Sequence, residues 1–146
     1  MPVSLSTIRQ RIANKMVTLS GFTAARNPFN QFNRNPDTVA NKRFSIGIPR
    51  SIALEGQRQN PPDGILMETT VLIKWPFRIR PKDQVTDYDR SMDVAQDVIT
   101  AIIPRAAPLH EDLQITMENF SQALTPSGEF LITILEISVI HSISLS

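Results

Sequence analysis

The chain has 146 residues and a formal net charge of +1, from 15 basic and 14 acidic side chains. This length suits one domain, which we expect to span residues 1–146. The absence of cysteine excludes disulfide scaffolds, cysteine zinc sites and thiol nucleophiles. The absence of cysteine also fits a protein made in a reducing cytosol. No secretory signal peptide is recognisable and no apolar stretch approaches the ~18 residues of a membrane helix, so we expect no membrane contact.

The near-neutral total is a cancellation between two oppositely charged halves. Residues 1–82 carry 13 basic and four acidic side chains, a net charge of +9, whereas residues 83–146 carry two basic and ten acidic ones, a net charge of −8. A uniformly basic nucleic-acid binder and a uniformly acidic solvating chain both fit this distribution poorly. It favours self-association through unlike patches, with a nucleic-acid-binding module that uses the basic half as the alternative.

The first part of the chain predicts one helix and two long connections. Residues 4–19 place their apolar side chains at steps of three and four, and Gly21 is expected to stop this helix. Residues 24–42, rich in asparagine and proline, and residues 50–64 are predicted as long loops. We interpret the first loop as a docking element for a partner, with burial beneath the loop as the alternative; its candidate contact residues are Phe29, Phe32 and Arg34.

Period-two alternation of apolar and polar side chains predicts four strands. They span residues 43–49, 65–80, 113–118 and 130–145, and Pro76 is expected to mark a bulge or a sheet edge because it has no N–H. Together with the helices, the strands predict an α+β fold. We expect a roughly four-stranded, mostly antiparallel sheet with two helices packed on one face, plus the long loops.

A second helix is predicted over residues 86–103, with Thr86 as its N-cap. Asp89, Asp93 and Asp97 recur every four residues and therefore form an acidic stripe along it. The expected apolar stripe consists of Tyr88, Met92, Ala95, Ile99 and Ile102.

Motifs for catalysis or cofactor binding are not recognisable in the sequence. There is no glycine-rich phosphate loop, no nucleophile elbow and no histidine zinc motif, so we expect no catalytic residue, metal or cofactor. The string from Asp87 to Asp93 resembles the start of a calcium loop, but Met92 and Val98 occupy the positions that require glycine and glutamate. A helix face explains these aspartates better, and His141 falls on the apolar face of the last strand.

The order of elements resembles the tail terminator proteins of tailed bacteriophages. The resemblance spans most of the chain and is carried by a helix, two strands, a second helix and a closing hairpin. These features are Leu5–Leu19, Phe44–Ile48, Ile65–Arg80, the helix with Tyr88-x-x-x-Met92, Val98-Ile99 and Ile102, and the hairpin Leu113–Val139 with Ser127-Gly128-Glu129 before Phe130-Leu131.

The resemblance implies a non-enzymatic virion protein that is assembled in the host cytoplasm. Such proteins form a hexameric ring at the head-proximal end of the tail tube, where the ring stops tube polymerisation and joins the tail to the neck. The implied partners are further copies of the chain, the tail tube protein, a neck or head-completion protein, and genomic DNA that passes through the channel without sequence readout. Another head–tail connector or neck protein is the nearest alternative.

A closed ring needs head-to-tail contacts between two different patches, which the opposed charges can supply. We therefore expect basic side chains of one subunit to face the acidic stripe of a neighbour. The candidate interface residues are Arg50, Arg58, Arg78, Arg80, Asp89, Asp93 and Asp97.

Overall fold

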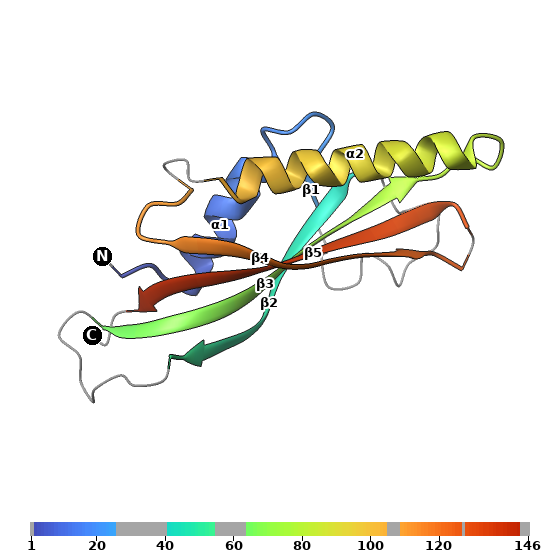
Figure 1. Cartoon of the computed structure of the whole chain (residues 1–146). Helices are drawn as coiled ribbons and strands as arrows, with labels where there is room; N and C mark the ends of the chain where they lie inside the picture. The colour runs from blue at the N-terminus through green and yellow to red at the C-terminus, as the bar shows by residue number, and fades with distance from the viewer. Residues whose placement is uncertain (1, 26–40, 55–63, 105–108, 127, 144–146) are drawn as a thin grey trace.

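The computed structural model describes residues 2–25, 41–54, 64–104, 109–126 and 128–143. This part of the chain holds two helices and five strands (Figure 1): α1 (Leu5–Met16), β1 (Thr23–Ala24), β2 (Arg43–Ala53), β3 (Ile65–Arg78), α2 (Gln84–Ile102), β4 (Gln114–Leu124) and β5 (Phe130–Ile143). The strands form one open sheet in the order β1-β2-β3-β5-β4. Only β1 and β2 are parallel. The predicted α+β class is confirmed, but the sheet is mixed and has a fifth strand.

The centre of the sheet is the antiparallel pair of β3 and β5. The two strands pair along all 14 residues of each, from Ile65 opposite Ile143 to Arg78 opposite Phe130. Both helices lie on the same side of the sheet (Figure 1). Alternate side chains of the two strands are buried against them, chiefly Val71, Ile73, Trp75, Leu135, Ile137 and Val139.

Pro76 lies inside a central strand, so its predicted position at a bulge or an edge is wrong. It stands opposite Ile132 in an unbroken stretch of the β3–β5 register. Its carbonyl accepts a hydrogen bond from the Lys42 N–H on the β2 side. In an antiparallel strand the nitrogen and carbonyl of one residue point to the same side. The N–H that proline lacks would therefore point toward β2. Pro76 lies beyond Lys74, the last β3 residue that pairs with β2, so no hydrogen bond between these two strands is lost.

Helix α1 is shorter than the predicted residues 4–19. Its N-cap is Ser4, whose hydroxyl accepts a hydrogen bond from the Thr7 N–H at 3.2 Å. Its buried residues are Ile8, Ile12 and Met16, as the spacing predicts. The chain then turns before Gly21, which has a positive φ of 81°. Gly21 therefore belongs to the turn into β1 rather than to the helix end.

Helix α2 begins earlier than predicted. In its first two turns, a different face of the helix points inward than the sequence predicts. Its N-cap residue is Asp83 rather than Thr86, and this side chain makes no capping hydrogen bond. The buried side chains in these turns are Asp87 and Ser91, whereas Tyr88 is 47% exposed and Met92 40% exposed. The predicted apolar stripe is therefore correct only from Ala95 onward. Polar partners, described below, hold Asp87 and Ser91 inward.

The outer strands are longer than the alternation predicts. β2 continues through residues 50–53, which the sequence predicts as part of a loop, and β4 continues to Leu124 rather than ending at 118. Each contains a register shift, between Gly47 and Arg50 in β2 and between Met117 and Asn119 in β4. A shift reverses the side-chain alternation, which is why the pattern appeared to stop there. The other residues of the predicted loops, 26–40 and 55–63, lie outside the described residues.

A buried chain of hydrogen bonds fastens the N-terminal segment to the sheet. His141 is 1% exposed, its Nδ1 lies 2.9 Å from the Val3 carbonyl and its Nε2 lies 2.6 Å from Thr69 Oγ1. Because a carbonyl only accepts, Nδ1–H donates to Val3 and Nε2 accepts from the Thr69 hydroxyl. Thr69 Oγ1 in turn lies 2.7 Å from the hydroxyl of Ser51. This assignment applies to the neutral imidazole, the form that burial of His141 favours.

This arrangement predicts a loss of stability in mild acid. Burial lowers the pKa of His141 below its ordinary value of 6.5. The unfolded chain therefore binds a proton before the folded chain does, and the free energy of unfolding should fall as the pH drops from about 7.5 through 6.5 toward the folded-state pKa. Urea unfolding at pH 7.5 and 5.5 measures this fall. His141→Gln should reduce the difference between the two pH values, whereas the control His110→Gln should keep it; an equal difference in both variants would contradict the assignment.

Candidate functional site

The outward face of α2 carries the predicted acidic stripe. Asp89, Asp93 and Asp97 are all exposed, on the side of the helix opposite its buried residues. Within the described part of the chain, none of the three makes a salt bridge. The stripe is therefore open to a cationic surface on another molecule.

Arg80 is held by its own chain. Its Nε lies 3.0 Å from Oδ2 of Asp87 and its terminal nitrogen NH2 lies 2.9 Å from Oδ1, while the Arg80 backbone N–H donates to Oδ2 at 2.8 Å. Asp83 adds a longer contact at 3.7 Å. These bonds to Arg80 lower the pKa of Asp87 from 3.8 to about 2. We predicted Arg80 to face a neighbouring subunit, but the structure uses it to fix the start of α2 against the end of β3.

A second polar contact holds the first turns of α2 in this orientation. The Gln122 side-chain amide of β4 donates to the hydroxyls of Ser91 at 3.3 Å and Thr133 at 3.1 Å. The Ser91 hydroxyl also donates to the Tyr88 carbonyl at 2.6 Å, so the buried polar groups at this contact have hydrogen-bond partners. Sequence reasoning missed both contacts, although a carboxylate seven residues after an arginine, at the first turn of a helix, was a signal for the first.

The other predicted basic residues lie apart from the acidic stripe. Arg50 of β2 and Arg78 of β3 are exposed and stand in register positions whose side chains point away from the helices. Within one chain, then, these arginines and the stripe on α2 occupy opposite sides of the sheet. Four predicted residues lie outside the described residues: Arg58, Phe29, Phe32 and Arg34.

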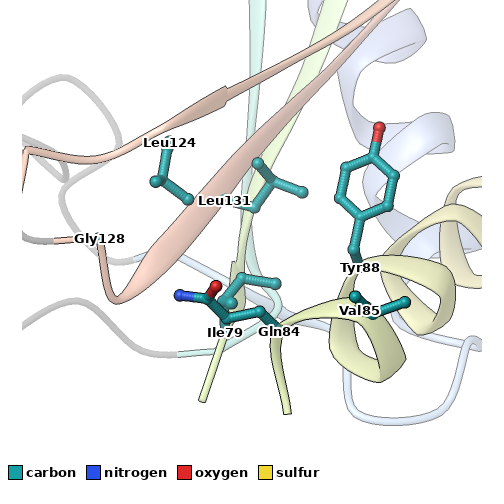
Figure 2. A pocket seen from close by; sticks show the side chains of 7 residues that line it. All are labelled: Ile79, Gln84, Val85, Tyr88, Leu124, Gly128 and Leu131. Atoms are coloured by element: carbon teal, nitrogen blue, oxygen red, sulfur yellow. The ribbon is translucent and has the colours of Figure 1, made fainter. Parts of the chain in front are cut away.

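An apolar groove lies between the first turns of α2 and the end of the β4–β5 hairpin (Figure 2). It encloses about 320 Å³, and three of its lining side chains are largely exposed: Val85 at 77%, Tyr88 at 47% and Leu124 at 58%. Its remaining lining residues are Ile79, Gln84, Gly128 and Leu131. This lining suits contact with apolar surface rather than acid–base chemistry. The groove exists because α2 is rotated, so the sequence pattern alone could not reveal it.

The described residues bring no candidate metal site together, since they contain no group of three histidine or acidic side chains that could hold an ion. The calcium-like string from Asp87 to Asp93 is continuous α-helix. His110 is occupied at the end of α2, where its Nε2 lies 2.7 Å from the Ile102 carbonyl. None of the described helices is long and apolar enough to cross a bilayer.

Comparison with known proteins finds no family model and no curated protein that matches this chain. Three exposed features of the described residues bear on function. They are an acidic helix face, basic side chains on the far side of the sheet, and an apolar groove. All three are features of an interaction surface.

The Arg80–Asp87 pair yields a stability prediction. Asp87→Asn removes the charge that Arg80 binds at two atoms, so the melting temperature should fall by several degrees, whereas the matched variant Asp93→Asn on the exposed face should leave it nearly unchanged. Because the pKa of Asp87 is lowered, its contribution should persist at neutral pH and disappear as the pH falls from about 3.8 toward 2. Thermal unfolding of both variants at pH 7 and pH 2.5 measures this. Equal melting temperatures for the two variants at pH 7 would contradict the role assigned to the pair.

Proposed function

We propose that the chain is a structural subunit of the tail terminator kind, which assembles head to tail into a ring of six copies. In this proposal the ring closes the head-proximal end of a phage tail tube, contacts the tube protein and a neck protein, and lets genomic DNA pass through its channel. The protein acts in the virion and performs no chemistry.

One observation carries the proposal: a single subunit presents an exposed row of aspartates on one side of its sheet and exposed arginines, with Glu68 and Glu136 among them, on the other. The acidic stripe on α2 lies on the helix side, and Arg50 and Arg78 lie on the other side. In a contact between unlike patches, each subunit uses two different surfaces, one to bind the preceding subunit and one to bind the next. Such contacts repeat by rotation until the ring closes.

The nucleic-acid-binding alternative has less support from the geometry. Arg80, one of the basic residues of the first half, has its guanidinium bound to a buried carboxylate of the same chain. A binding assay with duplex DNA at about 50 mM salt separates the two functions, since a nucleic-acid-binding module should show strong, salt-sensitive affinity. A connector at another position of the neck would share the ring and differ in its partners.

Native mass spectrometry tests the assembly directly. Six copies of the 16.4 kDa chain should give a species of about 98 kDa that increases with protein concentration. Light scattering behind a sizing column provides an independent mass. A strict monomer across the whole concentration range, also in the presence of tube and neck proteins, would contradict the proposal.

The acidic stripe can be tested by reversing its charge. The double variant Asp93→Lys with Asp97→Lys should shift the assembly toward monomer, because it turns an attractive contact into a repulsive one. Gln96→Lys is the matched control, since it adds positive charge to the same exposed helix without removing an aspartate. The two proteins are compared by sizing at equal concentration and low salt. Equal assembly would remove the stripe from the interface.

A further inference from the structure

Strand β4 and most of β2 leave backbone hydrogen-bonding groups on their outer sides without a strand beside them. In the described part of the chain, β4 pairs only with β5, and β1 covers β2 only at Arg43 and Phe44. The rest of the outer side of β2 and the whole outer side of β4 therefore have no strand neighbour among these residues. An open edge of this kind is a template for a strand from another chain.

The two edges have opposite strand directions. β2 is antiparallel to β3, β3 to β5 and β5 to β4, so β2 and β4 run in opposite senses. In a ring every copy has the same orientation relative to the rotation axis. The β4 edge of one copy would therefore meet the β2 edge of the next in antiparallel fashion, which is the slightly more stable of the two pairings.

The regular parts of the two edges also match in position. Both strands have 11 residues. Pro49 and the register shift beside it interrupt β2, which leaves Arg50–Ala53 as its regular segment at one end, and β4 is regular over Gln114–Met117 before its own shift. When two strands of equal length overlap in antiparallel fashion, the last residues of one face the first residues of the other. The register in which Ile52 faces Thr116, one residue from complete overlap, keeps the helices of both copies on one side of the sheet and sets these two segments beside each other.

The side chains at this contact are complementary. β2 contributes arginines and no acid, whereas the charged residue of β4 is Glu118, next to the segment that would face Arg50. In the helix layer, α2 is bonded to β4 through Ser91 and Gln122, and α1 packs against β2. The same pairing would bring the acidic α2 of one copy toward the next copy's α1, which has three basic residues and no acidic one.

We propose that the β4 edge of one subunit binds the β2 edge of a second copy of this chain, so that the sheets of neighbouring subunits continue into one another. This inference rests on the proposed ring and assigns its interface to the sheet edges. In this contact Arg50 of one copy lies near Glu118 of the next, and the acidic stripe on α2 lies toward α1 of the next copy rather than toward Arg50. The occupant of the β4 edge is the strand segment Arg50–Ala53 of the neighbour, in antiparallel orientation.

Cysteine cross-linking tests this contact, because the natural chain has no cysteine to interfere. Ile52→Cys is combined with Thr116→Cys in one chain, since both side chains are exposed on the face without helices. To allow for a shift in register, Ile52→Cys is also combined with Gln114→Cys or with Asn119→Cys. Mild oxidation should give a ladder of covalent oligomers for at least one pair. An equimolar mixture of the two single-cysteine chains should stop at the dimer, because each chain then has one thiol.

The matched control for cross-linking pairs Thr116→Cys with Arg9→Cys. Arg9 is equally exposed but lies on α1, away from the strand edges. This pair should give only the weak cross-linking of random collisions. Disulfide formation needs Cα atoms within about 7 Å, so a ladder identifies neighbouring strands rather than general proximity.

A charge exchange provides a second and independent test. Arg50→Glu and Glu118→Lys should each raise the concentration at which half of the assembly dissociates by about tenfold, and the double variant should restore most of the loss. Lys82→Glu, exposed in the turn before α2, is the control and should have little effect. The measurement is sizing with light scattering over a dilution series.

The outcomes separate this inference from the proposed ring. A ring that forms normally, yields no ladder in any register and shows no rescue by the charge exchange would overturn the edge contact and leave the ring intact. A chain that stays monomeric under all conditions would overturn both. A ladder together with rescue supports the contact.

Discussion

The antiparallel pairing of β3 with β5 is the constraint on which the other elements depend. Fourteen residues on each strand are in continuous register, and their alternate side chains form the floor on which both helices pack. Because the period of a strand is two, this register fixes which side chains face the helices and which face away. It also places β2 and β4 at the two sides of the sheet, and so determines which surfaces are left for other molecules.

Two polar contacts then adjust the elements around this centre. His141 and Thr69 fasten the N-terminal segment to β3 and β5, and the Arg80–Asp87 pair fixes the start of α2. Each is a buried or half-buried group whose partners lie far away in sequence or in a different element. The second contact also has a consequence for the surface, since turning Asp87 inward turns Tyr88 outward and opens the apolar groove.

The opposed charges of the two halves of the chain have a definite arrangement in the fold. One part is neutralised internally, as the pairing of Arg80 with Asp87 shows. Another part remains exposed on opposite sides of the sheet, with the acidic stripe on the helix side and Arg50 on the other. Only the exposed part can contribute to the binding of other molecules. The net charge of each half of the sequence therefore overstates the charge available for assembly.

The sequence pattern alone specifies the α+β class, both helices and the four main strands, because periods of 2 and 3.6 residues depend only on local geometry. It also determined the acidic stripe, whose spacing needs nothing but a helix. The rotation of α2, the length of β2 and β4 beyond their register shifts, and the place of Pro76 in a central strand were decided by the tertiary structure. Each depends on a partner distant in sequence: Arg80 and Gln122 for the helix, and the end of the β2 ladder for the proline. No local pattern contains that information.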